Sequence, residues 1–390
     1  MNNDKKTVKI VIAFILIASL SFITFHRWYK KTKAPDVTVI ESVMEANGPE
    51  RVSTNFINTL KDSLDVQIKA SHKFFKSDLP QEQSKSTKNR KKLVGKVIVY
   101  LDNSMLGKPP LTAFLSNNQS SNRIRIAYLM HKPDSIPDEW TRSLNKCFDL
   151  VAVPDACLTE LYKNSGVTIP IFELPMGLNL EQFTNLPLKT TKHYPFIFAH
   201  LSTNASKRNQ IQLIRAFYST FGNSQDVKLR INSRFINTSY NKEIKNEIHR
   251  LGATNIDFTE INMDRDFYCK TLQTIDCYIS LSLDEGISTH AKEAMALGIP
   301  TIFTDDTGNS KIYRSNLGRN IFSACSTSNN SQEISNDHAS EEVISALKDV
   351  YENYNVYLQQ KFAARNWVKQ YSYDQLKPLV LGLIKPKKLS

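Results

Sequence analysis

Residues 278–304 constrain the fold more than any other stretch of the sequence. In this stretch a loop and a helix connect two short apolar runs. Residues 278–281 and 300–304 predict buried strands, and residues 291–297 predict a helix between them. This unit predicts two parallel strands, with Glu285 in the loop after the first strand and Glu293 in the helix. Ligands bind at this end of parallel strands, and an ionised carboxylate accepts several hydroxyl donors. The pattern suits sugar hydroxyls, although a structural unit with two solvated glutamates has the same pattern.

Strand and helix patterns alternate in two series along the chain. The first series has predicted strands at 37–40, 96–101, 125–129 and 148–153, and predicted helices at 51–60 and 157–163. Before the unit above, the second series has predicted strands at 196–198, 227–232 and 256–258, and predicted helices at 211–217, 241–251 and 266–274. Two such series predict an α/β protein with two Rossmann-like, doubly wound domains that face a cleft. A chain of 390 residues with 41% hydrophobic content can bury both cores.

Residues 10–25 form an apolar run without a charged side chain. Lysines precede the run, and Trp28, Tyr29 and further basic residues follow it, as at a membrane interface. A spanning helix needs roughly 17–25 residues, which the run reaches when Val8 and a snorkelling Lys9 extend it. The alternative is a cleaved signal peptide, but the residues after the run are bulky rather than small. We therefore predict a single transmembrane helix that anchors the chain in a membrane and whose orientation the flanking charges leave open.

Charge and cysteine content narrow the range of partners. The formal net charge is +12, with excess basic residues beside the apolar run and in residues 85–92. Such charge favours an anionic lipid surface, or it belongs to solvated loops. No nucleic-acid recognition motif accompanies it, so nucleic acid is not a predicted partner. The five cysteines are odd in number and lack metal-ligand spacing, which predicts reduced thiols and no metal site.

Four further segments accompany the two glutamates, in a constant order along the chain. They are Asn47-Gly48-Pro49-Glu50-Arg51-Val52, Pro175-Met176-Gly177-Leu178-Asn179, Ser206-Lys207-Arg208-Asn209 and Asp305-Asp306-Thr307-Gly308-Asn309. With these segments, and with Glu285 and Glu293 in a Glu-x7-Glu spacing, the sequence resembles the retaining family 4 glycosyltransferases. The resemblance covers most of residues 37–370. It implies the GT-B fold, in which two Rossmann-like domains face a cleft.

The resemblance implies a nucleotide-diphosphate sugar as the donor, no separate cofactor and no metal ion. The residues implied to bind the nucleotide are Glu293, Lys207, Arg208, Gly48, Gly308 and Asn309. Lysine and arginine there would stabilise the negative charge that develops on the departing diphosphate. The catalytic candidates are Glu285, which would contact the donor sugar, and His131, which lies at a strand end and contacts the sugar or serves a structural role. The sugar would be transferred to the donor's own face, with retention of configuration.

Three positions depart from the family pattern. Residues 201–204 contain no cation where many members carry an arginine, Lys132 lacks an acidic neighbour that some relatives have, and Asn179 replaces the usual aspartate. The main prediction is a metal-independent retaining glycosyltransferase that moves a sugar to a glycan or a lipid-linked acceptor. The alternative is a degenerate GT-B protein that binds a glycan or a protein partner without turnover.

The chain is predicted to divide into four segments. They are a membrane anchor with basic flanks at 1–34, an acceptor-side domain at 35–185, a nucleotide-sugar-binding domain at 186–353, and a terminal helix with a tail at 354–390. Residues 340–372 predict one or two helices, the last of which, at about 355–370, is expected to cross back to the first domain. The catalytic domain is predicted to face the cytosol, where nucleotide sugars are made. A glycan at Asn204-Ala205-Ser206 would otherwise block the predicted phosphate loop.

Overall fold

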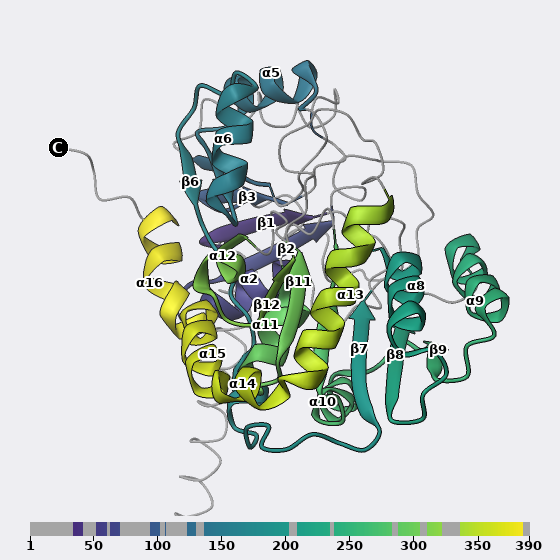
Figure 1. Ribbon diagram of the computed structural model, residues 1–390. Coiled ribbons are helices and arrows are strands. Elements are labelled where there is room, and N and C mark those ends of the chain that lie inside the picture. The colour runs from purple at the N-terminus through teal and green to yellow at the C-terminus, as the bar shows by residue number, and fades with distance from the viewer. Residues whose placement is uncertain are drawn as a thin grey trace, which may run out of the picture.

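The computed structural model describes two separate parallel sheets (Figure 1). The described residues are 34–41, 52–60, 63–70, 94–101, 106, 123–129, 136–202, 209–234, 238–282, 288–304, 310–321 and 336–384. The two parallel sheets confirm the predicted pair of Rossmann-like domains. Among these residues no helix has the length and apolar character that crossing a membrane requires. The predicted anchor at 10–25 lies outside them.

The first sheet has six strands in the order β2-β1-β3-β4-β5-β6, and every pairing is parallel. The strands are β1 (Val37–Glu41), β2 (Val66–Ala70), β3 (Val97–Tyr100), β4 (Ile124–Tyr128), β5 (Leu150–Val153) and β6 (Ile171–Glu173). The four residues of β3 are all buried, because a parallel sheet is covered on both faces and takes near-continuous apolar strands. The chain order reverses between β1 and β3, so ligands of this sheet are expected beyond the carboxyl ends of these strands.

Three helices of the first domain lie around this sheet: α2 (Val52–Leu60), α5 (Asp138–Cys147) and α6 (Ala156–Asn164). Phe56 and Leu60 of α2 pack with one face of β1 and β3, while Leu144 and Leu158 of α5 and α6 pack with the other face. Asp155 caps α6 by accepting a hydrogen bond from the backbone N–H of Cys157 at 3.0 Å. The helices thus complete a covered α/β layer.

The second sheet has the order β12-β11-β10-β7-β8-β9, again with parallel pairings. Its strands are β7 (Phe196–Ser202), β8 (Val227–Ser233), β9 (Ile256–Glu260), β10 (Cys277–Ser280), β11 (Thr301–Thr304) and β12 (Arg319–Ile321). The order reverses between β7 and β10. This is the point at which a doubly wound sheet forms a crevice for a ligand.

Helices cover both faces of the second sheet (Figure 1). They are α8 (Gln210–Phe221), α9 (Ser239–Leu251), α10 (Arg265–Gln273), α11 (Thr289–Ala296), α12 (Ser310–Ser315) and α13 (Asn336–Glu352). Alternate residues of β7 enter opposite cores: Phe196 and Phe198 pack with α8 and α13, whereas Ala199 and Leu201 pack with α10 and α11. Because successive side chains of a strand point to opposite faces, β7 contributes to two hydrophobic clusters.

Gly298 ends α11 in a left-handed conformation with φ of 71°. The backbone N–H groups of Gly298 and Ile299 donate to the carbonyls of Met295 and Ala294 at 2.9 and 3.0 Å. A Cβ atom at residue 298 would lie 2.7 Å from Leu188 and 2.8 Å from Lys361, which belong to the interdomain linker and to the C-terminal helices. Glycine is thus required here by both conformation and space.

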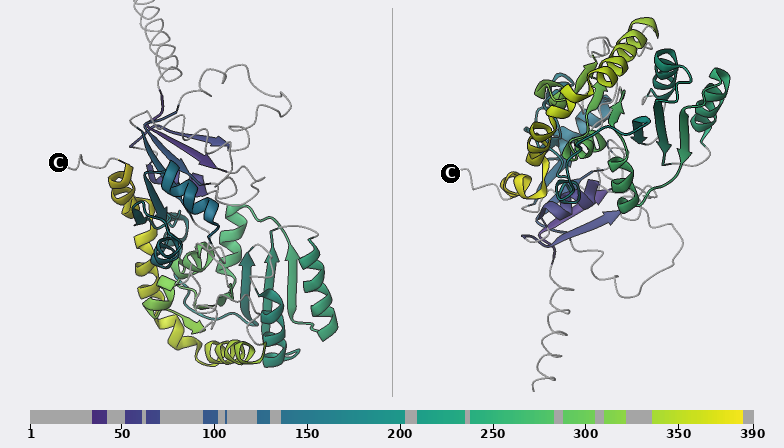
Figure 2. Two further views of the ribbon diagram at one scale, coloured as in Figure 1. Left: turned by 90° about the horizontal axis from the view of Figure 1, so that it is seen from above. Right: turned by 60° about the horizontal axis from the view of Figure 1, so that its bottom comes forward.

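The chain ends in α14 (Tyr354–Gln359), α15 (Lys361–Val368), the 3-10 turn η6 (Lys369–Tyr371) and α16 (Tyr373–Ile384). These elements run along one side of both sheets (Figure 2). In α15, Ala364 and Val368 pack in the second domain, whereas Val380 and Ile384 of α16 pack in the first. The Tyr373 hydroxyl donates to Asn55 Oδ1 of α2 at 2.6 Å. The return to the first domain thus occurs at α16, after the predicted 355–370.

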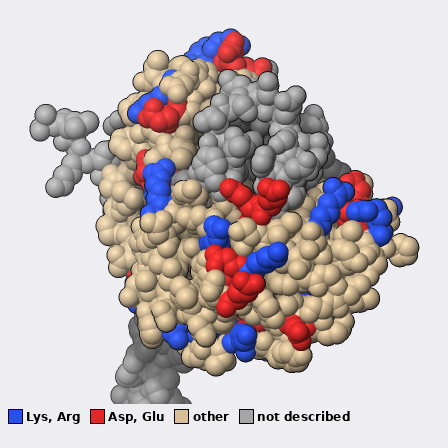
Figure 3. All heavy atoms as spheres, viewed as in Figure 1, with Lys and Arg blue, Asp and Glu red and all other residues tan. Residues whose placement is uncertain are grey.

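On the face shown in Figure 3, basic and acidic side chains lie beside one another. One ion pair joins the two domains, because Lys311 of α12 contacts the carboxylate of Glu173 in β6. Close by, Arg314 Nη2 lies 3.7 Å from Cys157 Sγ of α6. Two cations of α12 therefore face the first domain.

Candidate functional site

The carboxyl ends of β7, β10 and β11 meet at one edge of the second sheet, beside its switch point. Side chains tie these ends together. The Asn209 amide, immediately after the basic segment, donates to the Leu281 carbonyl at 3.0 Å, and the Thr304 hydroxyl donates to the Ser282 carbonyl at 2.6 Å. Asn209 has a positive φ of 55°, which asparagine tolerates better than most residues. This edge is thereby held as one unit.

His200 lies buried inside the switch point. Its Nδ1 atom is 2.8 Å from the Ile279 carbonyl, which only accepts, so Nδ1 carries the proton and donates. Its Nε2 atom lies 3.2 Å from Gln210 Nε2 and accepts from that amide when the ring is neutral. The contacts thus show a buried histidine that joins β7, β10 and the start of α8.

Glu293 occupies α11 and is 1% exposed. Its two carboxylate oxygens have different donors: Arg265 Nη1 lies 2.8 Å from Oε1, and the Tyr268 hydroxyl lies 2.8 Å from Oε2. Burial, together with the negative charge of Glu293, raises the pKa of Tyr268 well above its usual value. Tyr268 therefore keeps its proton and acts as a donor to the carboxylate.

Arg265 also contacts the linker between the two sheets. Its Nε donates to Gln182 Oε1 at 2.8 Å, in α7 (Glu181–Thr184), and its Nη2 donates to the Asn179 carbonyl at 3.2 Å. The guanidinium carbon lies 4.8 Å from the centroid of the Phe183 ring, a cation–π distance. One side chain thus joins the linker to Glu293. Arg265 was not among the residues predicted from the sequence. The signal that the sequence offered was its position at the start of a helix that Asp264 caps.

Glu293 is the member of the predicted site that the described residues include. The other predicted site residues lie outside them: Glu285, His131, Lys207, Arg208, Gly48, Gly308 and Asn309. Their segments follow β1, β4, β7, β10 and β11, all at carboxyl ends of strands. Both the positions and the roles of these residues therefore stay predictions.

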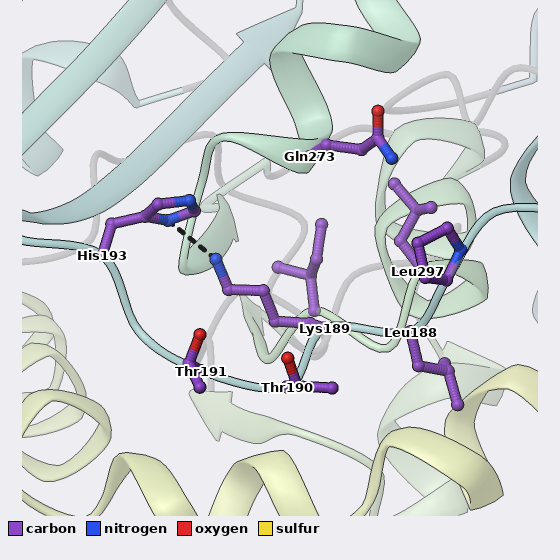
Figure 4. Close-up of a pocket in the computed structure, with 9 residues that line it drawn as sticks. Leu188, Lys189, Thr190, Thr191, His193, Gln273 and Leu297 are labelled. Carbon is purple, nitrogen blue, oxygen red and sulfur yellow. Dashed lines mark hydrogen bonds between the residues drawn. The ribbon is translucent and has the colours of Figure 1, made fainter.

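A pocket of ≈ 200 Å³ lies at the opposite end of the second sheet (Figure 4). Lys189 and His193, which precede β7, meet there at 2.7 Å, and Lys189 Nζ also lies 2.8 Å from the buried Asp276 just before β10. Burial lowers the pKa of Lys189, while the hydrogen bond to Asp276 opposes that shift. The volume of the pocket is below the roughly 300–1,000 Å³ of most ligand sites. The carboxylate of Asp276 is already paired with Lys189. The pocket is therefore a structural feature of the linker rather than a donor site.

Among the residues that the structure describes, no group of three or more histidine, cysteine or acidic side chains could hold a metal ion. The described Cys147, Cys157, Cys269 and Cys277 are not joined in disulfide bonds. The chemistry of the site as described is thus that of carboxylate, guanidinium and phenol groups. It suits hydrogen bonding to a polar ligand.

Residues 185–359 match the family model described as glycosyl transferases group 1. No curated protein sequence matches the chain. The matched residues contain the second sheet, Arg265, Tyr268 and Glu293. The family match therefore covers the part of the molecule in which the candidate site lies.

Several solved structures share the fold. TarM of S. aureus is 15% identical with a TM-score of 0.59, and the alignment covers 74% of this chain and 54% of TarM. HepE of Anabaena, in complex with UDP and glucose, is 12% identical with a TM-score of 0.64, covering 89% of this chain and 99% of HepE. The α,α-trehalose-phosphate synthase (UDP-forming) from Burkholderia xenovorans is 10% identical with a TM-score of 0.63, covering 89% and 99%. At these identities the likeness shows the two-domain architecture.

Proposed function

We propose that this chain, a group 1 glycosyltransferase of the GT-B fold, transfers a sugar from a nucleotide-diphosphate sugar to a glycan or a lipid-linked acceptor. The predicted function class, a retaining glycosyltransferase that uses a nucleotide sugar, is confirmed by the family match over residues 185–359. The acceptor, the donor's base and sugar, and the role of each residue belong to the proposal.

The position of Glu293 carries the proposal. The residue lies in the helix that follows β10, at the switch point where a doubly wound sheet binds nucleotides. Its carboxylate is oriented by Arg265 and Tyr268, and such a group accepts hydrogen bonds from vicinal hydroxyls. Glu293 therefore binds the ribose of the donor, as the Glu-x7-Glu resemblance implies.

The remaining roles follow from the charge that develops during transfer. Breaking the glycosidic bond leaves negative charge on the nucleoside diphosphate, which Lys207 and Arg208 would stabilise without a metal ion. Glu285 contacts the transferred sugar, and His131 contacts it from the first domain. Gly48 and Gly308 would let the backbone approach the donor closely, and Asn309 would contact the donor in the segment that follows β11. TarM and HepE were each solved with UDP, which makes uridine donors the first to test.

The proposal is tested by incubating the full chain in detergent with UDP-, GDP- and ADP-glucose and measuring release of the nucleoside diphosphate. We expect slow hydrolysis of one donor and a roughly ten- to hundredfold loss on Glu285→Gln or Glu293→Gln, the effect of losing one charged hydrogen bond. Glu160→Gln, with its side chain 68% exposed on α6, is the matched control. A wild-type chain that binds a donor without hydrolysing or transferring it would favour the non-catalytic alternative.

We also propose that residues 10–25 anchor the chain and that both domains face the cytosol. Cys147, Cys157, Cys269 and Cys277, which form no disulfide bond in the described part of the chain, support a reducing compartment. A tag added at the C-terminus tests the orientation in sealed membranes. Protease should remove the tag only from the cytosolic side, and removal only from the other side would reverse the assignment.

A further inference from the structure

Two side chains from a single helix hold the Glu293 carboxylate. Arg265 and Tyr268 are three residues apart in α10 and therefore project from the same face. Each donates to a different carboxylate oxygen at 2.8 Å, so the plane of the carboxylate is fixed by two separate directions. A carboxylate held by one donor could rotate about its last bond, whereas this one has a single favoured orientation.

Arg265 and Tyr268 do not use all the hydrogen-bond acceptor positions that a carboxylate such as Glu293 offers. An ionised carboxylate offers about four acceptor positions, and Arg265 and Tyr268 account for one on each oxygen. A ribose with two neighbouring hydroxyls needs one position on each oxygen. The arrangement is therefore compatible with a ribose that adds to, rather than replaces, the two side chains.

Arg265 is itself held in place from three sides. The side chain is 16% exposed, stacks on Phe183, and donates to Gln182 and to the Asn179 carbonyl. Asn179 and Gln182 lie between β6 and β7, in the connection between the two domains. A lysine could keep the charge but not these separate donor directions, because only the guanidinium is a planar fork. The position of the linker is thus transmitted to Glu293 through one rigid group.

We propose that Arg265 and Tyr268 are positioning residues that orient Glu293 for the two ribose hydroxyls, and that Arg265 couples this orientation to the interdomain linker. The inference rests on the proposed function, because it requires a nucleotide at Glu293. Its distinctive consequence is selectivity: the variants lose discrimination for the ribose hydroxyl more than they lose affinity for the rest of the nucleotide.

The test compares binding of UDP, GDP and ADP, each with its 2′-deoxy counterpart, to the full chain in detergent by calorimetry. For the nucleotide that binds, the wild type should favour the ribose form by about tenfold or more, the value of a charged hydrogen bond. Arg265→Lys and Tyr268→Phe should reduce this ratio to roughly threefold or less, with the affinity for the deoxy form kept. Glu293→Gln should bring the ratio to about one.

Arg230→Lys is the matched control, since Arg230 is a half-buried arginine of the same domain that donates to Thr274 at 2.8 Å. Both affinities should stay at the wild-type value in this variant. If Arg265→Lys and Tyr268→Phe weaken both forms equally and keep the ratio, the residues have only a structural role and the inference is overturned. A wild type that binds none of the nucleotides overturns the proposed function as well, whereas a wild type without ribose preference removes only the role of Glu293 and its two donors.

Discussion

Glu247 links the two helices α8 and α9, and its titration gives a quantitative prediction. Its carboxylate accepts from Arg215 Nε of α8 at 2.6 Å and from Arg250 Nε and Nη2 of α9 at 2.9 and 2.7 Å. The side chain is 9% exposed. Hydrogen bonds from Arg250 and Arg215 lower the pKa of Glu247 from 4.5 to about 2. Because α8 begins just after the predicted phosphate segment, this pair of helices is expected to support the proposed donor site.

The lowered pKa corresponds to about 3 kcal/mol of stability at neutral pH, at about 1.4 kcal/mol for each pH unit. Both arginines are more than half exposed, so solvent screening reduces the expected value to about 2 kcal/mol. A group whose pKa falls on folding contributes fully above its unfolded pKa. Its contribution is then lost between about pH 4.5 and about pH 2, with roughly two fifths gone at pH 3.5.

We therefore expect Glu247→Gln to lower the free energy of unfolding of the second domain by about 2 kcal/mol at pH 7, and by clearly less at pH 3.5. Urea unfolding followed by Trp367 fluorescence reports on this domain when Trp28 and Trp140 are replaced by phenylalanine. Glu160→Gln in the same background is the control and should change the value by less than about 0.5 kcal/mol. A loss in Glu247→Gln that is equal at both pH values would refute the electrostatic explanation.

Three further predictions concern the linker, the site and the domain interface. Arg365 donates to the carbonyls of Ala296, Thr184 and Leu186 at 2.7, 3.2 and 2.8 Å, so Arg365→Met should cost about 2–3 kcal/mol in thermal unfolding, and Arg365→Lys less. Glu293→Gln should raise the dissociation constant of the nucleotide, whereas Glu285→Gln should mainly lower turnover. Steady-state kinetics separates the two effects, and unchanged kinetics in both variants would contradict the assignment. Lys311→Glu should place like charges across the domains and reduce turnover about fivefold, with recovery when Glu173→Lys is added.

The buried elements could be predicted from the sequence, because covered parallel strands are apolar on both faces. Residues 97–100 and 277–280 are buried throughout, and the predicted strands coincide with β3 and β10. Three of the four edge strands gave no such signal, whereas β9 (Ile256–Glu260) was predicted. In β6, Phe172 is 47% exposed and Glu173 follows it, so three residues at a sheet edge have no apolar run. The same reason applies to β2 and β12, which border the two sheets and were not predicted.

The site was only partly accessible to sequence reasoning. Glu293 has a recognisable spacing, but its donors lie 28 and 25 residues away in α10, and no local pattern indicates that pairing. The helix α5 was also missed. Its apolar residues Trp140, Leu144 and Cys147 follow helical spacing, so a signal for this helix was present in the sequence. The contacts of Glu293 with Arg265 and Tyr268 depend on how α10 and α11 pack, so they could be identified only from the structure.

The position of the last helices also determines the order in which the protein can fold during synthesis. At Gly298 the second domain packs against Lys361, and the core of the first domain includes Val380 and Ile384, which follow the whole second domain in the chain. Domains usually fold from the N-terminus while the ribosome still extends the chain. Here α2 meets its partner helix α16 only after residues 373–384 have been synthesised and have left the ribosomal tunnel. A nascent chain that stalls before residue 361 would therefore leave apolar surface exposed in both domains, as a substrate for chaperones.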